Sequence, residues 1–134
     1  MAGETELGRL LAGMAPRLHA DEFVFCTAPA EAIHPLCAET VGLFCEDEGY
    51  SVILPRQAAE RAGLVGAFPS RMITLGVDSS LDAVGFLAAV LERLASAGIS
   101  VNPIAGFHHD HLFVPAARAD AAMATLHALA AEHR

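Results

Sequence analysis

Three histidines and an aspartate stand side by side near the end of the chain. His108, His109, Asp110 and His111 form its densest group of side chains that can transfer protons, bind metals or form polar contacts. Because side chains alternate along an extended segment, His109 and His111 are expected to share one side. Two imidazoles do not complete a metal site, and a third ligand would have to come from a distant loop or a second chain. We expect a polar ligand pocket here and no metal or cofactor; the alternative is a structural turn in which Asp110 accepts backbone hydrogen bonds.

A second polar group consists of Asp78, Ser79 and Ser80. Ser79 with Asp82 three residues later has the pattern of a capping box, which predicts the start of a helix. A helix N-terminus presents free N–H groups to a carboxylate, and Asp78 could accept a hydrogen bond from an ammonium group. This turn therefore offers complementary ends to a zwitterion. In the alternative interpretation, Ser79 only caps the helix and Asp78 is a solvated turn residue.

An acid–base enzyme, metal-dependent or not, centred on the turn at residues 108–111 is the alternative function. Histidine titrates near neutral pH, so His111 with Asp110 or Asp78 could move a proton. No nucleophile motif accompanies them, and the acidic run at residues 46–48 is expected to be a solvated hairpin tip. We therefore assign no catalytic residue.

The composition excludes several classes of function. The 134 residues carry a formal net charge of −8, which opposes binding to nucleic acid or to an anionic membrane. All eight cationic side chains are arginine, so the chain has no lysine for a Schiff base or a phosphate-binding loop. No apolar run reaches the roughly 18 residues of a membrane span, and no secretion signal precedes the first elements. These features predict a cytoplasmic protein.

The second half is expected to form strand, helix, strand, strand and helix. Alternation over residues 71–78 places Ile73, Leu75 and Val77 on one buried face of a strand. Further strands are expected over residues 99–105 and 111–114. The first helix is expected to end at Gly98. The buried stripes of the two helices are expected to be Leu81, Val84, Ala88, Leu91 and Ala95, and then Ala119, Ala122, Met123, Leu126 and Leu129.

This pattern stops one strand short of a ferredoxin-like sandwich with strand order 4-1-3-2. Pro103 cannot donate to a ladder, which suits the second strand because that strand lies at an edge. The opposite edge needs a fourth strand, which must come from the first half or from another copy of the chain.

The first half repeats the pattern more faintly. Strands are expected over residues 22–27, 41–45 and 50–54, the last two joined as a hairpin, and a helix follows residue 55. Residues 7–18 are expected to form a short helix or a strand broken at Pro16. We infer an α+β fold of two related halves, residues 1–66 and 67–134, each a ferredoxin-like βαββα(β) unit with an antiparallel sheet and helices on one face.

The chain resembles the ACT-like family of small bacterial proteins of unknown function, which consist of paired ACT-type halves. The resemblance rests on the segments at 78–85, 97–102 and 106–115, with support from 23–27 and 54–56. The resemblance implies binding of amino acids or similar small molecules and regulation of enzymes. The family's ligand-contacting loops match Asp78, Ser79 and Ser80, and the turn from Phe107 through His108, His109 and Asp110 to His111.

We therefore expect a non-catalytic sensor that binds a small polar metabolite, an amino acid in the first instance. The ligand is expected at the junction of two halves or two chains, where it would order residues 78–81, including Leu81, and residues 106–111. A homodimer that acts in trans on a partner enzyme or regulator is expected, since no catalytic domain is fused to these halves.

Overall fold

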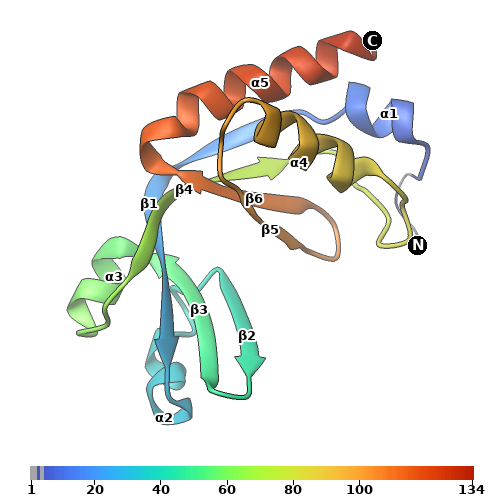
Figure 1. Ribbon diagram of the computed structural model, residues 1–134. Helices are drawn as coiled ribbons and strands as arrows, with labels where there is room; N and C mark the ends of the chain where they lie inside the picture. Colours follow the sequence, from blue (N-terminus) through green and yellow to red (C-terminus); the bar gives the residue numbers. More distant parts are fainter. Residues whose placement is uncertain (1–2, 4) are drawn as a thin grey trace. The chain divides into compact units, whose positions relative to one another are not determined.

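The computed structural model describes residue 3 and residues 5–134, which divide into two compact units (Figure 1). The terminal unit contains the described residues up to His19 together with Arg71–Arg134, and the central unit contains Ala20–Ser70. Two long strands, β1 (Pro16–Ala28) and β4 (Ala67–Leu75), each contribute residues to both units. Within the described part of the chain, no helix has the length and apolar character needed to cross a membrane.

The terminal unit is a split βαβ arrangement. Besides its parts of β1 and β4, it contains α1 (Leu7–Ala12), α4 (Phe86–Ser96), β5 (Asn102–Ala105), β6 (Asp110–Pro115), the short 3₁₀ helix η2 (Ala116–Arg118) and α5 (Ala119–Glu132). Its strands are hydrogen-bonded in the order β1–β4–β6–β5, and β5 pairs with β6 antiparallel. Counted from β4, this is the order 4-1-3-2, so the ferredoxin-like prediction is confirmed.

The fourth strand of this unit comes from the first half of the chain. Residues 16–19 of β1 lie beside the end of β4, where Arg71 Nε donates to the carbonyl oxygen of His19 at 2.8 Å. The other edge is β5, which carries Pro103, as predicted. The β5 edge therefore follows the rule that ladder positions without a donor belong at the rim of a sheet.

One face of these strands packs against α1, α4 and α5 (Figure 1). The core joins the strand residues Ile73, Leu75, Leu112 and Val114 to helix residues that are at most 3% exposed, among them Leu10, Val90, Leu94, Leu126 and Leu129. The predicted stripe of α5 is confirmed: Ala119, Ala122, Leu126 and Leu129 are buried and Met123 packs against them.

The predicted start and buried face of α4 are wrong. The helix begins at Phe86, after Gly85 in a left-handed conformation with φ of 89°, and no side chain caps it. Its buried residues are Phe86, Val90 and Leu94. The expected stripe fails, since Leu81, Val84, Ala88 and Ala95 are exposed and Leu91 is only half-buried. The reason is that Ser79 is engaged with Asp110, so the capping box does not form and residues 76–85 make an irregular connection.

The central unit contains α2 (Ala30–Ile33), the 3₁₀ helix η1 (His34–Leu36), β2 (Gly42–Glu46), β3 (Gly49–Pro55) and α3 (Arg56–Arg61). Its strands have the order β2–β3–β1–β4, and both β2 and β1 pair with β3 antiparallel. The predicted hairpin is thus confirmed. β4 begins at Ala67, the first residue of the expected second half; the division into related halves at residue 66 stays a prediction.

The corrected face of α4 can be tested with two leucines. Leu94→Ala removes a side chain with no exposure, so we expect a loss of about 2–5 kcal/mol in the free energy of unfolding, measured by urea denaturation. Leu81→Ala is the matched control: its side chain is 66% exposed, and we expect a change below about 0.5 kcal/mol. Equal losses for both variants would contradict the observed start of α4.

Candidate functional site

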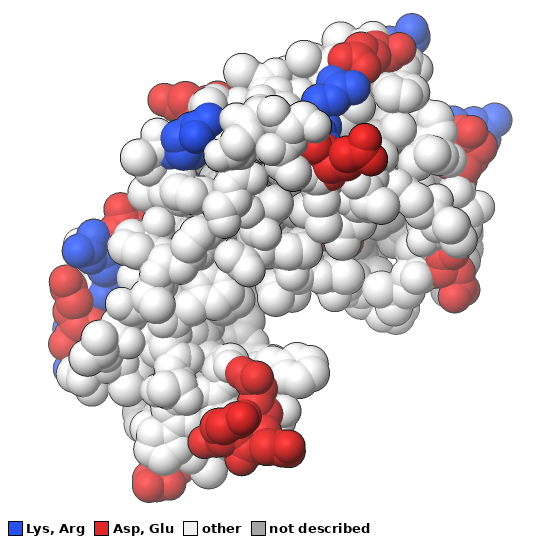
Figure 2. All heavy atoms as spheres, viewed as in Figure 1, with Lys and Arg blue, Asp and Glu red and all other residues white. Residues whose placement is uncertain are grey.

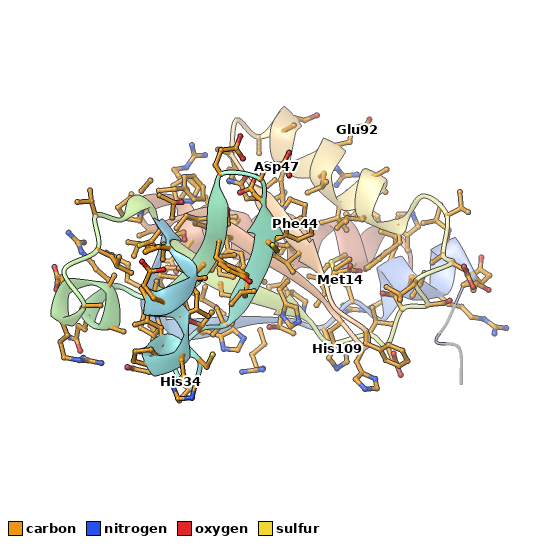
Figure 3. All side chains as sticks on the ribbon, turned by 90° about the horizontal axis from the view of Figure 1, so that it is seen from below. Met14, His34, Phe44, Asp47, Glu92 and His109 are labelled. Atoms are coloured by element: carbon orange, nitrogen blue, oxygen red, sulfur yellow. The ribbon has the colours of Figure 1, made fainter. Side chains whose placement is uncertain are left out.

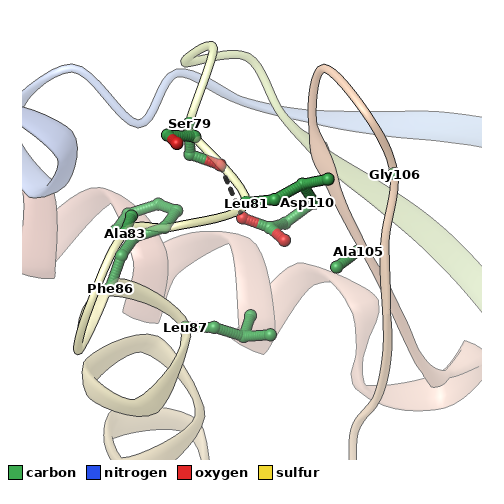
Figure 4. Close-up of a pocket in the computed structure, with 9 residues that line it drawn as sticks. Ser79, Leu81, Ala83, Phe86, Leu87, Ala105, Gly106 and Asp110 are labelled. Atoms are coloured by element: carbon green, nitrogen blue, oxygen red, sulfur yellow. Dashed lines mark hydrogen bonds between the residues drawn. The ribbon is translucent and has the colours of Figure 1, made fainter. Parts of the chain in front are cut away.

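A small cavity lies in the terminal unit between the start of α4 and the β5–β6 hairpin (Figure 4). Its volume is about 120 Å³. Its walls come from two segments: the irregular connection with the first turn of α4, and the facing hairpin. The lining residues are Ser79, Ser80, Leu81, Ala83, Phe86, Leu87, Ala105, Gly106 and Asp110. All belong to the terminal unit, so this cavity needs no contribution from the central unit.

A buried carboxylate marks one wall of the cavity. Asp110 begins β6 and is 7% exposed, and Ser79 Oγ donates to its Oδ2 atom at 3.0 Å. The second carboxylate oxygen points toward the space beside Leu87 and Ala105 (Figure 4). No described arginine forms an ion pair with Asp110. A buried acid without a cationic partner is well suited to accept a hydrogen bond from a ligand's ammonium group.

The opposite wall contains the N-terminus of α4. Phe86 and Leu87 line the cavity, and the N-cap residue Gly85 has no side chain to accept from the first free N–H groups. The helix has 11 residues, so these N–H groups carry the partial positive charge of a full helix terminus. The cavity therefore combines an anionic side chain with backbone groups that attract an anion.

The connection that forms this wall is held by close backbone contacts. A methyl group on Gly3 would come within 2.4 Å of the carbonyl oxygen of Asp78, so residue 3 lies directly against the backbone at residues 78–80. In the facing hairpin, Gly106 N donates to the carbonyl oxygen of His109 at 2.9 Å and closes the turn. Any side chain at Gly3 would force the connection to move.

The cavity includes part of the predicted ligand-binding set: Ser79, Ser80, Leu81 and Asp110 line it. Five predicted residues do not line it. Asp78 is exposed, and so are Phe107 and His108, whose rings stack edge to face with centroids 5.0 Å apart. His109, at the hairpin turn (Figure 3), contacts the carbonyl oxygen of Val77 through Nδ1 at 3.1 Å. The N-cap expected at Ser79 is instead Gly85, and Asp78, the expected ammonium acceptor, is exposed and does not line the cavity.

His111 points to the other side of the strand from Asp110. Its Nδ1 atom lies 2.9 Å from Thr74 Oγ1, and the same hydroxyl lies 2.7 Å from His19 Nε2. Burial is the main cause that lowers the pKa of His111, with His109 and Arg17 acting in the same direction and Asp110 opposing them. Among the described residues, no group of three or more His, Cys, Asp or Glu side chains is arranged to hold a metal ion.

Sequence reasoning missed the apolar part of the cavity, which consists of Ala83, Phe86, Leu87, Ala105 and Gly106. Alanine, leucine and phenylalanine carry no signal that separates a cavity wall from an ordinary core. Gly85 was the one signal in the sequence for the true start of the helix, because glycine is also accepted at the N-cap position.

The Ser79–Asp110 bond can be tested by removing its donor. Ser79→Ala leaves a buried carboxylate oxygen without its partner, so we expect the free energy of unfolding to fall by about 1–3 kcal/mol in urea denaturation. Ser80→Ala is the matched control, because the Ser80 hydroxyl accepts from the exposed Asp82 N–H; we expect a loss below about 1 kcal/mol. If the two variants lose the same stability, the buried bond does not hold the wall in place.

Solved structures share this architecture. A protein of unknown function from Vibrio cholerae, described as a possible transport protein, is 39% identical; the match covers 92% of this chain and 95% of that chain, with a TM-score of 0.82. A protein from Agobacterium tumefaciens is 16% identical over 86% of this chain and 87% of its own, with a TM-score of 0.70. The ligand-free regulatory subunit of aspartate kinase from Thermus thermophilus is 12% identical over 87% of this chain and 97% of its own, with a TM-score of 0.69.

At their low identities, the Agobacterium and Thermus structures show the fold alone. None of the curated proteins matches the chain. Two family models of the ACT domain match it, one over residues 2–71 and the other over residues 67–128. Together with the Vibrio structure, these matches show that the chain belongs to the ACT domain family, whose members are ligand-binding regulatory modules.

Proposed function

We propose that this chain is a non-catalytic sensor that binds an amino acid in the cavity beside Asp110 and regulates a separate enzyme or regulator in the cytoplasm. The observation that carries the proposal is the pairing of opposite charges in one small cavity: the Asp110 carboxylate on one wall and the uncapped N-terminus of α4 on the other. A free α-amino acid carries the matching pair of charges on two groups that are bonded to the same carbon atom.

The ligand's ammonium group would donate to the second oxygen of Asp110, which points into the cavity. Hydrogen bonds to an ionised partner are about twice as strong as neutral ones, and the low exposure of Asp110 reduces competition from water. The ligand's carboxylate would accept from the free N–H groups at Phe86 and Leu87. The apolar walls would surround the ligand's carbon atoms.

A regulatory role that is exerted on another protein has support from the comparisons. The Thermus protein of similar fold is named as the regulatory subunit of aspartate kinase, and the alignment covers 97% of that chain. The acid–base alternative has less support, because His109 and His111 each have a ring nitrogen engaged with Val77 or Thr74 and neither lines the cavity.

The proposal is tested by thermal-shift measurements with each of the twenty amino acids at millimolar concentration. An amino acid at about one hundred times its Kd should stabilise the folded protein by about 2.7 kcal/mol, which corresponds to a clear rise in Tm. Asp110→Asn keeps an oxygen that can accept from Ser79 but removes the charge, and it should abolish that rise. Asp82→Asn makes the same change on an exposed side chain and should preserve it. No rise with any amino acid, or an undiminished rise in Asp110→Asn, contradicts the proposed site.

We further propose that two copies pair through β2 as a homodimer. β2 is the edge strand of the central unit, and every one of its residues is exposed or half-exposed. Leu43 and Phe44 are 47% and 72% exposed, and no proline or lysine protects this edge. Acidic side chains gather at the hairpin tip, where Asp47 lies (Figures 2 and 3). An antiparallel β2–β2 pair places the two acidic tips at opposite ends, so like charges do not meet.

Light scattering coupled to gel filtration tests this pairing. We expect a dimer for the wild type and a monomer for Phe44→Glu, because the added carboxylates would face each other across the new ladder. Val65→Glu is the control: it places the same charge on an apolar side chain that is 92% exposed and lies outside β2. A monomeric wild type, or a Phe44→Glu variant that stays dimeric, would rule out the β2 interface.

A further inference from the structure

The cavity has room beside Asp110 because the residue paired with it across the hairpin is small. Ala105 on β5 is the direct partner of Asp110 on β6, and both residues line the cavity. Side chains of directly paired residues lie on the same face of a sheet, with Cβ atoms about 5 Å apart. The methyl group of Ala105 leaves open the space toward which the second oxygen of Asp110 points (Figure 4). A longer side chain at residue 105 would fill that space.

The wall formed by α4 consists of large side chains that the core holds in place. Phe86 is the first residue of α4, is 2% exposed and belongs to the core of the terminal unit. Leu87 is half-buried and packs against the same core. Neither side chain can turn away from the cavity without opening a void in that core. The distance between this wall and Ala105 is therefore set by packing.

The resulting volume suits a very small ligand. The cavity measures about 120 Å³. A cavity of roughly 150 Å³ takes one benzene molecule. Alanine has as many non-hydrogen atoms as benzene and glycine has fewer, whereas valine, leucine and the aromatic amino acids have more. On size alone, the cavity matches the smallest amino acids.

The charge of the walls restricts the ligand further. Of the described residues that line the cavity, Asp110 alone carries a charge. The ammonium group of an α-amino acid neutralises it, so the cavity has no cation for a second carboxylate and no second acid for a cationic side chain. Burial of a charge without a partner is costly. An added hydroxyl is rejected much less strongly by an apolar pocket, so serine belongs with alanine and glycine.

We propose that the cavity is selective for the smallest uncharged α-amino acids, namely glycine, alanine and serine, and that Leu87 and Ala105 set this limit. The inference rests on the proposed amino-acid site, because the ligand's two charged groups must be held at Asp110 and at the start of α4. With both groups held, the substituent on the α-carbon has to fit between Leu87 and Ala105. The protein would then respond to small amino acids and ignore large or charged ones.

Isothermal titration calorimetry of the full chain with single amino acids tests the selectivity. We expect glycine, alanine and serine to bind, and valine and leucine to bind at least about tenfold more weakly, because methylene groups that do not fit carry such a penalty. Aspartate should bind at least about a hundredfold more weakly, since its second carboxylate meets Asp110. If longer side chains pass Leu81, which is 66% exposed, into solvent, leucine will bind as tightly as alanine, and the size limit is overturned.

Leu87→Ala should widen the cavity and change the preference. We expect valine and leucine to gain at least about tenfold in affinity relative to alanine. Leu91→Ala is the matched control: this leucine lies one turn later on α4 and is half-buried against the same core, but it does not line the cavity. It should keep the wild-type order of affinities. An unchanged order in Leu87→Ala, or the same change in Leu91→Ala, would contradict the role of Leu87.

Ala105→Leu makes the opposite change and gives a second measurement if Leu87→Ala does not fold. Residue 105 is exposed at the edge strand, so the longer side chain should leave the fold intact while it fills the space beside Asp110. We expect alanine to bind at least about tenfold more weakly. Ala95→Leu is the control, because Ala95 is exposed on α4 and does not line the cavity. Wild-type affinity for alanine in Ala105→Leu overturns the proposed limit.

Failure of the size limit and failure of the proposed site give different results. A large or charged amino acid that binds the wild type as tightly as alanine, and loses its binding in Asp110→Asn, leaves the sensor and removes the selectivity. If none of the twenty amino acids binds the wild type, the site itself is removed and the selectivity with it.

Discussion

A strand inside a sheet must satisfy its backbone hydrogen-bonding groups on both sides, and β4 does so on one side through β1. The terminal unit supplies β6 on the other side of β4. At the junction with β1, Gly76 N donates to the carbonyl oxygen of Met14 at 2.7 Å and Arg71 reaches the carbonyl of His19. Without residues 16–19, β4 would be an exposed edge beside a large apolar core. The rest of the terminal unit is built on this pairing.

The two-residue period of a strand then places two residues that are adjacent in sequence in different environments. Once β6 pairs next to β4, Asp110 faces the helices and lines the cavity, whereas His111 faces Thr74 on β4. A shift of one residue in register would exchange these environments and place an imidazole in the cavity. The different surroundings of Asp110 and His111 therefore follow from strand geometry.

The charge distribution explains why backbone groups form the positive side of the cavity. The chain has no lysine, and in the described structure three of its arginines are engaged at the surface with Glu22, Glu39 and Glu132. In an acidic chain, a helix N-terminus provides positive potential without the cost of burying a cation. The position of this positive potential depends on where the helix begins, which is Phe86.

Periodicity by itself determined the order of elements, the β2–β3 hairpin, the edge position of Pro103 and the buried stripe of α5, because each follows from local side-chain spacing or from a missing donor. The types of residue in the two polar turns also indicated Asp110 and Ser79 as candidate ligand-binding residues. Tertiary structure alone decided that these two residues bond to each other, that α4 starts at Phe86, that Asp78 is left in solvent and that β1 supplies the fourth strand. The physical reason is that Ser79 has two possible partners, the free N–H groups of a helix or a buried carboxylate, and only the packing of β6 beside β4 brings the carboxylate to 3.0 Å.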